Sequence, residues 1–128
     1  MSDEAPLGLV LWTTDILALA RFLEQAAGFL IEERHPGFAA LSKEGSSVIL
    51  HDDEAARGHP WYNALRKEGV ARGIGAEIHL RVADVEKAYR TALNLGGLAI
   101  QGPTTVEGGE ECSVMGQDGY VFAFWRRT

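Results

Sequence analysis

The stretch Ala76-Glu-Ile-His-Leu-Arg-Val-Ala-Asp84, followed by Val85-Glu-Lys-Ala-Tyr-Arg-Thr-Ala-Leu-Asn-Leu95, decides the fold. In its first part apolar and polar residues alternate, which is typical of a strand with one buried side. After Asp84 the apolar residues recur at the period of a helix, and Asp84 stands where an N-cap is expected. Gly96-Gly97 then predicts the end of that helix. The sequence therefore predicts a strand that runs directly into a helix.

The polar side of this predicted strand carries Glu77, His79 and Arg81 at alternate positions. Because the apolar side faces the helix, these side chains point to the opposite face of the sheet. Side chains two residues apart on a strand lie about 6.5 to 7 Å apart, close enough to contact one ligand. The function of the protein depends on what this opposite face contacts.

The same pattern occurs earlier in the chain, between Leu9 and Gly28. When Asp15 is set against Asp84, the apolar positions of the two segments coincide and Gly28 falls on Gly97. This correspondence indicates an internal repeat. Each copy is followed by strand-like runs that turn residues separate: Leu30 to Arg34, Phe38 to Ser42 and Ser47 to His51, then Leu98 to Gln101, Glu111 to Met115 and Tyr120 to Trp125.

We therefore predict an α+β fold of tandem β-α-β-β-β modules that form a curved, eight-stranded mixed sheet with helices on its convex side. Residues 1–6 are expected to be a tail, 7–52 the first module and 75–128 the second, all within one domain. Residues 53–74 are the linker, with a short helix predicted from Trp61 to Lys67. Alternation predicts that the helices are faced by Val48, Leu50, Phe122 and Phe124.

Composition and charge narrow the choice of partner. The formal net charge of −6 argues against nucleic acid, because binding phosphates needs clustered Lys and Arg. No apolar run reaches the roughly 20 residues of a membrane-spanning helix. The single cysteine, Cys112, allows no internal disulfide, and we expect it to pack as a small apolar residue. These features predict a cytoplasmic protein with neither a nucleic-acid nor a membrane partner.

The duplicated order resembles the vicinal oxygen chelate superfamily, which includes glyoxalase I, extradiol dioxygenases, fosfomycin-resistance enzymes and bleomycin-resistance proteins. The residues that carry the resemblance are Asp15 through Phe29, Gly75 through Gly97, and Gln117-Asp118-Gly119 before the last strand. The resemblance covers nearly the whole chain after Leu7. It implies a concave ligand-binding face, a linker that covers one end of the cavity, and a homodimer whose clefts lie between subunits.

The resemblance also implies where a metal would be bound. Metal-dependent members take ligands from the first and last strand of each module, at positions that correspond here to Gly8, Ile49, Glu77 and Ala123. Of these, only Glu77 has a donor side chain, whereas a catalytic divalent metal needs about three protein ligands. We therefore expect no ordinary metal site and no cofactor. An alternative site made from His51, Glu77 and His79 would need a geometry unlike the family's.

The predicted concave face suits a planar or amphiphilic organic ligand. Trp12 and Trp125 are expected to sandwich an aromatic ring or a cation, unless they fill the concavity or pack at a subunit interface. Arg81 can hold a carboxylate, Glu77 an amine, and His79 a hydrogen-bonding group, although the three can equally form an internal polar network. The expected ligand-binding residues are Trp12, Ile49, His51, Trp61, Glu77, His79, Arg81, Ala123 and Trp125.

The loops carry further polar and aromatic residues. Asp52-Asp53-Glu54 can meet a cationic ligand or form a solvated loop. His59-Pro60-Trp61-Tyr62, in the linker, can contact the ligand as a lid or anchor the linker on the sheet. His35 stands before Pro36-Gly37 in a turn and is expected to be solvated.

The predicted function is that of a glyoxalase/bleomycin resistance protein-like binding protein that needs no metal and sequesters an aromatic or cationic antibiotic, without catalytic residues. The alternative is a small lyase, isomerase or dioxygenase of the same superfamily, with an atypical metal or none. In that case His79 or Glu77 would be the general base, although no accompanying nucleophile is visible in the sequence. A third possibility is a dimeric or regulatory module whose own side chains fill the cavity.

Overall fold

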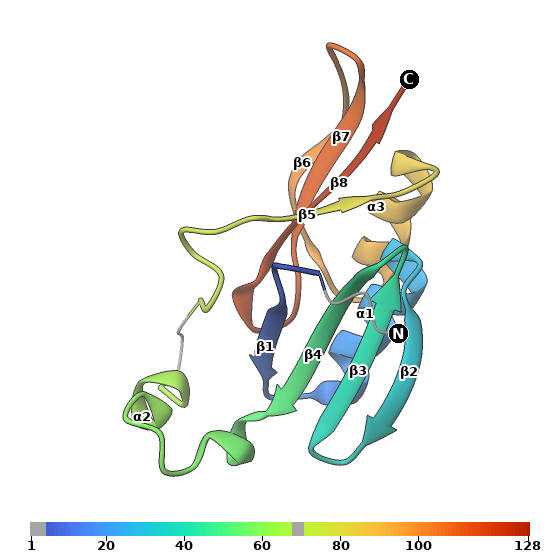
Figure 1. The fold of residues 1–128 in the computed structure, drawn as a ribbon. Coiled ribbons are helices and arrows are strands. Elements are labelled where there is room, and N and C mark those ends of the chain that lie inside the picture. Colours follow the sequence, from blue (N-terminus) through green and yellow to red (C-terminus); the bar gives the residue numbers. More distant parts are fainter. Residues whose placement is uncertain (1–4, 68–70) are drawn as a thin grey trace.

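Two consecutive β-α-β-β-β modules make up the fold, which the computed structural model describes for residues 5–67 and 71–128 (Figure 1). The first contains β1 (Leu9–Thr13), α1 (Ile16–Ala27), β2 (Leu30–His35), β3 (Phe38–Lys43) and β4 (Ser46–Asp52). The second contains β5 (Ile78–Arg81), α3 (Val85–Asn94), β6 (Leu98–Val106), β7 (Gly109–Met115) and β8 (Val121–Arg127). The predicted α+β class and order of elements are confirmed.

The linker between the modules carries two short helices, which lie beyond the end of β4 in Figure 1. The 3-10 helix η1 (Asp53–Ala56) follows β4 directly, and α2 (Tyr62–Leu65) lies inside the predicted helix. A second 3-10 turn, η2 (Gln117–Gly119), joins β7 to β8. Residues 1–4 of the predicted tail and 68–70 of the predicted linker lie outside the described residues.

The strands are hydrogen-bonded as two four-stranded sheets, sheet A with the order β1-β4-β3-β2 and sheet B with the order β5-β8-β7-β6. Each sheet is mixed, because its first strand pairs parallel to its last and the others pair antiparallel. β1 and β5 therefore each form a sheet edge. The eight strands of the predicted mixed sheet are thus arranged as two four-stranded ladders, and among the described residues no ladder joins sheet A to sheet B.

The modules repeat each other in their helix caps and turns, as predicted. Asp15 and Asp84 each accept a hydrogen bond of 3.0 Å from the backbone amide three residues further on, which satisfies an otherwise unpaired donor of the first helical turn. Glu44 and Asp118 stand before a glycine in equivalent turns, and both take the left-handed backbone conformation, with φ of 49° and 58°. The duplication therefore extends to details that periodicity alone does not specify.

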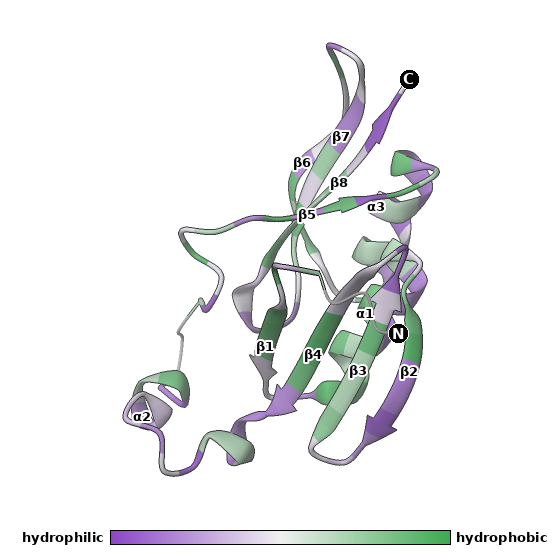
Figure 2. Ribbon diagram, in the orientation of Figure 1, coloured by the Kyte–Doolittle hydropathy of each residue, from purple (hydrophilic) through white to green (hydrophobic). Residues whose placement is uncertain are grey.

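Both helices and the inner faces of both sheets share one core. α1 and α3 pack against each other, and α1 lies behind sheet A in Figure 1. Phe22 of α1 reaches sheet B, where its ring centroid lies 5.0 Å from that of Phe122 and 6.3 Å from that of Phe124. Figure 2 shows hydrophobic residues along β3 and β4 and a hydrophilic end of β4. The residues predicted to face the helices are all buried: Val48, Leu50, Phe122 and Phe124.

Each module holds the end of the other module's first strand. Lys43 of β3 donates hydrogen bonds of 2.6 Å to the carbonyls of Arg81, at the end of β5, and Ala27, at the end of α1. Burial lowers the pKa of Lys43. In the other direction, Tyr120 Oη donates to the Trp12 carbonyl in β1 at 2.7 Å. Since these carbonyls of β1 and β5 are already bonded to side chains, neither strand joins the other sheet there.

The helices of the described residues are short. α1, which covers sheet A, has 12 residues, and α3 has 10. None of the helices in residues 5–67 and 71–128 has both the length and the apolar character needed to cross a membrane.

Candidate functional site

The open face of sheet A carries a stacked indole and imidazole. Trp12 lies opposite His51 in the parallel pair of β1 and β4, and their ring centroids are 4.7 Å apart with planes inclined by 29°. The alternation that buries Leu11 and Leu50 places these two rings on the other side of the sheet. Two flat side chains on neighbouring strands form a surface on which a planar ligand can stack.

The linker adds two more rings to this surface. His59 stacks on Trp61 with centroids 4.7 Å apart, and the two approach Trp12 edge-on at 5.8 and 5.1 Å. On β3, Phe38 lies 5.7 Å from the His51 ring. We call these five residues, Trp12, Phe38, His51, His59 and Trp61, the aromatic wall. Trp61 is 39% exposed, so the aromatic wall is open to solvent on the side of the linker.

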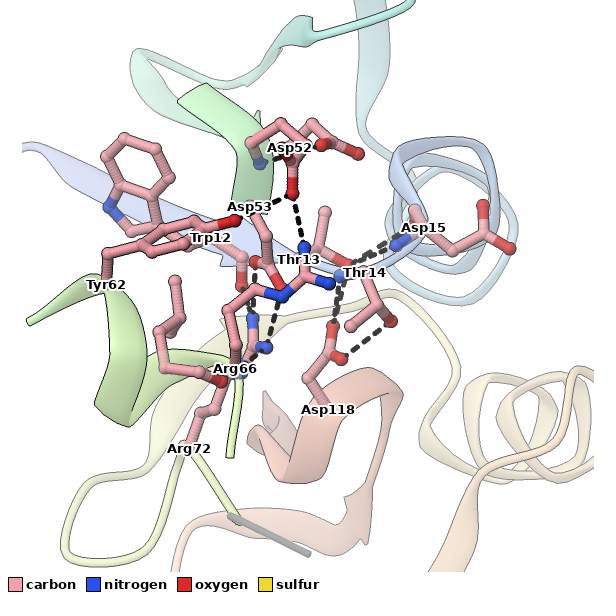
Figure 3. A network of polar contacts seen from close by, with 12 residues as sticks. Trp12, Thr13, Thr14, Asp15, Asp52, Asp53, Tyr62, Arg66, Arg72 and Asp118 are labelled. Atoms are coloured by element: carbon pink, nitrogen blue, oxygen red, sulfur yellow. Dashed lines mark hydrogen bonds and ion pairs between the residues drawn. The ribbon is translucent and has the colours of Figure 1, made fainter. Parts of the chain in front are cut away.

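A buried arginine connects the linker to β1 (Figure 3). Arg72 donates to both carboxylate oxygens of Asp53 at 2.8 Å, and the two side chains are 8% and 6% exposed. It also donates to the carbonyls of Trp12 and Leu65, each at 2.9 Å. The hydrogen bond with Asp53 raises the pKa of Arg72. One side chain therefore joins β1, η1 and the end of α2.

The backbone around Arg72 packs closely against the turn between β7 and β8. The Arg72 amide donates to the Asp118 carbonyl at 3.0 Å, and the Gly73 amide donates to the Gly119 carbonyl at 3.2 Å. A Cβ atom on Gly73 would lie 2.6 Å from the Cα of Tyr120, which is closer than such atoms approach. Glycine is therefore required at position 73 for the two segments to touch.

In sheet B, the equivalent face of β5 is polar. His79 Nε2 lies 3.0 Å from Glu77 Oε1, and both side chains are exposed. Arg81 does not join them, because its guanidinium donates at 2.7 Å to Glu44 in the turn between β3 and β4. The predicted trio is thus divided into a His79–Glu77 pair and an ion pair that connects the two modules.

Two arginines lie near the ring of Trp125 on sheet B. The guanidinium carbons of Arg81 and Arg127 lie 6.0 and 4.8 Å from the centroid of its ring. This arrangement permits cation–π attraction on the ring face, which is stronger where water is excluded. Both this indole and Trp12 therefore contact polar or aromatic side chains of their own module.

A groove of about 520 Å³ lies beside Glu77 on sheet B. Apart from this carboxylate, it is lined by glycine and apolar residues: Gly73, Ile74, Gly75, Ala76, Ile100, Met115 and Val121. A single carboxylate in apolar surroundings suits a ligand that joins an amine to an apolar body.

The structure brings some of the predicted ligand-binding residues together and separates others. The aromatic wall contains Trp12, His51 and Trp61, whereas Arg81 and Trp125 meet on sheet B. Ile49 pairs with Val10 in sheet A, and Ala123 pairs with His79 in sheet B. Trp12 and Trp125 belong to different clusters, so one chain alone does not form the expected sandwich.

The described residues offer no ready site for a metal ion. Among residues 5–67 and 71–128, no three His, Cys, Asp or Glu side chains are grouped so that they can hold one. His51 belongs to sheet A, whereas Glu77 precedes β5 and His79 lies in β5 of sheet B, so these three are not assembled as a site within one chain.

Asp53 and Arg72 were missed by the sequence analysis. The sequence predicts a ligand contact or a solvated loop for the run Asp52-Asp53-Glu54, and the structure corrects this for Asp53, which is buried against Arg72. Glu54 is exposed, as a solvated loop predicts. The small residues on either side of Arg72, Ala71 and Gly73, were the available signal, because they let the backbone approach another segment.

Comparison with known proteins identifies the fold. No protein-family model matches the sequence, and no curated protein matches it. Among solved structures, a glyoxalase/bleomycin resistance protein/dioxygenase family enzyme from Burkholderia phytofirmans PsJN matches with a TM-score of 0.75 and 21% identity, over 94% of this chain and 96% of that one. The chain has the vicinal oxygen chelate fold.

Two further solved structures with this fold have quite different names. Fosfomycin resistance protein FosX from Mesorhizobium loti matches with a TM-score of 0.69 and 14% identity, over 98% of this chain and 93% of that one. TioX from Micromonospora sp. ML1 matches with a TM-score of 0.65 and 19% identity, over 97% of each chain. At such identities the likeness establishes the shared vicinal oxygen chelate fold, whereas function has to be argued from the residues of the site.

Proposed function

We propose that this protein binds a planar organic ligand on the aromatic wall and does not transform it. The observation that carries the proposal is the stack of Trp12 and His51, whose ring centroids are 4.7 Å apart, with the linker rings packed beside it. Aromatic contacts of this kind contribute about 0.5–1.5 kcal/mol beyond the area they bury. The aromatic wall supplies rings and imidazole nitrogens, and its five side chains include no hydroxyl, thiol or amine nucleophile.

We propose that binding needs no metal. The positions where metal-dependent relatives carry ligands hold Gly8, Ile49, Glu77 and Ala123, so one carboxylate replaces a set of donors. A site shared between two chains would lack metal ligands in the same way, because each chain contributes the same residues at these positions. A divalent ion held by one carboxylate would bind weakly, since stable sites use about three or more ligands.

We further propose that the working form is a homodimer in which sheet A of one protomer faces sheet B of the other. Each sheet leaves one face open, and apolar side chains are exposed there or beside it: Val10 on β1, Leu98 and Ile100 on β6, and Ile74 in the groove. A second copy would bring Trp125 and the Glu77 groove opposite the aromatic wall, which would complete the expected sandwich. Twofold symmetry would produce two such clefts.

The ligand class that we propose is an aromatic or cationic antibiotic, sequestered in the cytoplasm. The net charge of −6, the carboxylate in the Glu77 groove and the affinity of indole faces for cations all support a cationic ligand. One neighbour with the same fold is named a fosfomycin resistance protein. The single cysteine, which is buried, suits a reducing compartment.

The test is a screen of cationic glycopeptides and aromatic antibiotics by tryptophan fluorescence and thermal shift. A ligand should change the emission and raise the Tm, and it should be recovered intact. Trp12→Leu should weaken binding by about tenfold, which corresponds to about 1.4 kcal/mol. The matched control is Leu30→Ala, which removes an exposed apolar side chain at the start of β2 and should leave binding unchanged.

Light scattering on the same samples tests the dimer. A mass of twice 13.9 kDa is expected. Binding that Trp12→Leu does not affect would contradict the aromatic wall as the site, and recovery of a chemically altered compound would contradict binding without chemistry.

The His79–Glu77 pair favours a second candidate, a lyase, isomerase or dioxygenase of the same fold. His79 is exposed and can accept a proton, and Glu77 at 3.0 Å can orient its ring. Metal analysis of protein purified without chelator discriminates this function, because near-stoichiometric zinc, nickel, manganese or iron would favour it. If the variant His79→Asn no longer contained that metal, the metal site would lie on sheet B.

A further inference from the structure

We propose that Arg72 is the positioning residue that fixes His59 and Trp61 against Trp12, so that residues 53–65 of the linker are a rigid part of the aromatic wall and not an opening lid. The inference rests on the proposed function, because it concerns the same binding surface. It adds a residue that contacts no ligand and acts through the rings that do.

The segment that carries the two linker rings is tied to Arg72 at both ends. Before the rings, Asp53 accepts two hydrogen bonds of 2.8 Å from the guanidinium, and after them the Leu65 carbonyl accepts one of 2.9 Å. Between these points, backbone bonds close consecutive turns, among them Tyr62 to His59 at 3.1 Å. A short segment with both ends bound to one group has few other arrangements available.

The guanidinium also contacts the residue on which the linker rings pack. Its Nη1 donates at 2.9 Å to the carbonyl of Trp12, whose indole receives His59 and Trp61 edge-on. The position of the linker relative to that indole is therefore set by one planar side chain. Lysine cannot replace it, because a single ammonium lacks the fork that binds a carboxylate in two places while also reaching two carbonyls.

Burial distinguishes this pair from the other ion pairs of the linker. Glu54 binds Arg57 and Arg66, and in those pairs every side chain is at least 47% exposed. Exposed pairs are screened by water and impose little geometry. Asp53 and Arg72 are 6% and 8% exposed, so separating them would leave a charge without water or partner. The linker is held by the buried pair.

The experiment measures the circular dichroism that arises from coupling between the indoles of Trp12 and Trp61, in the 128-residue chain without ligand. Trp12 and Trp61 lie 5.1 Å apart with planes inclined by 68°, an arrangement in which their far-ultraviolet transitions couple and give two bands of opposite sign. Trp61→Phe and Trp12→Phe define the spectrum without coupling. The wild type should show the paired bands, and both single variants should lose them.

The deciding variant is Arg72→Met combined with Asp53→Leu, which removes the anchor without leaving an unpaired buried charge. We expect it to lose most of the paired bands, down to the level of Trp61→Phe, while thermal unfolding stays cooperative. The single variant Arg72→Lys should also lack the paired bands. The matched control, Arg66→Gln, removes an exposed arginine from the same linker and should keep them in full.

Three results would overturn the proposal: paired bands that persist in the double variant, a wild type without them, or a double variant that no longer folds. In the last case Arg72 would be required for the whole fold and not for placing the rings. Because no ligand is present, this outcome is separate from the antibiotic screen. A screen without hits would contradict the proposed function and leave the spectra of the linker unchanged.

Discussion

The same place in the two modules carries the same kind of contact made from different groups. Trp12 stands three residues before Asp15, as Arg81 stands three residues before Asp84. Trp12 pairs with His51 and stacks on it at 4.7 Å, whereas Arg81 pairs with Trp125 and lies 6.0 Å from its ring centroid. Both modules therefore place two flat groups side by side on neighbouring strands, and the groups differ in their chemistry.

The surroundings of the two contacts differ more than the contacts do. On sheet A, the Trp12 carbonyl is bound by a buried arginine and the linker packs two rings against the indole. On sheet B, Arg81 is 58% exposed and reaches a turn of the other module. The linker, which belongs to neither copy of the repeat, therefore adds contacts to one of two similar faces, the one that we propose binds the ligand.

The largest effect should come from comparing the arginines at the two contacts. Arg72→Gln leaves Asp53 buried without its partner and should lower the free energy of unfolding by about 3–5 kcal/mol. Arg81→Gln breaks an exposed pair with Glu44 and should cost roughly 1 kcal/mol or less. Urea unfolding followed by far-ultraviolet circular dichroism measures both. Equal losses of unfolding free energy in the two variants would show that the buried and the exposed arginine stabilise the protein to the same extent.

A smaller loss of stability is expected when the helix cap of either module is removed, and it tests whether the two modules depend equally on their caps. Asp15→Ala and Asp84→Ala each remove a side-chain cap with a hydrogen bond of 3.0 Å, and each should cost about 1 kcal/mol of stability. Asn in place of either Asp keeps an acceptor and should restore most of the loss. The same urea titrations apply, and a large difference between the two sites would mean that one helix depends on its cap more than the other.

The smallest expected effect is a change in stability caused by Cys112 in sheet B, and it is absent at neutral pH. Cys112 pairs with Phe124 in sheet B as Ala39 pairs with Leu50 in sheet A, so Cys112→Ala makes the two modules alike there. Cys112 is buried, as predicted, and burial raises the pKa of its thiol from 9.0 to about 11.

A raised pKa of a thiol means that the folded protein favours the protonated form. The resulting stabilisation is complete below pH 9.0 and is lost as the pH rises to about 11, because the unfolded thiol ionises first. Cys112→Ala should therefore lose less stability than the wild type over this alkaline range, as measured by urea unfolding at successive pH values. If the free energy of unfolding fell equally with pH in the wild type and in Cys112→Ala, the raised pKa of the Cys112 thiol would be contradicted.

The modules themselves could be predicted because local sequence determines them. Asp15 and Asp84 mark the change from a period of two to a helical period, and each is followed by glycine where its helix ends. Alternation also placed Trp12 and His51 on the open face, since a strand reverses the direction of its side chains at every residue. These signals act over a few residues, and the fold that they specify is confirmed.

The way in which the modules join could not be predicted. The bond from Lys43 to the Arg81 carbonyl spans 38 residues, and that from Tyr120 to the Trp12 carbonyl spans 108, so no periodic pattern connects either pair. Arg72 and Asp53 meet for the same reason, through packing of the linker on another segment. Whether Trp12 and Trp125 share a ligand also depends on how two sheets face each other, which alternation within a strand does not specify.

The bonds at the end of β1 have one further consequence, for aggregation. An exposed sheet edge is a template on which strands of other molecules can add one after another. Here the Trp12 carbonyl is taken by Arg72 and Tyr120, and the Thr14 amide donates to Asp118 at 3.2 Å. An incoming strand would meet an occupied carbonyl at Trp12 and an occupied amide at Thr14. The residues that set the position of an indole therefore also shorten the stretch along which a fibre could grow.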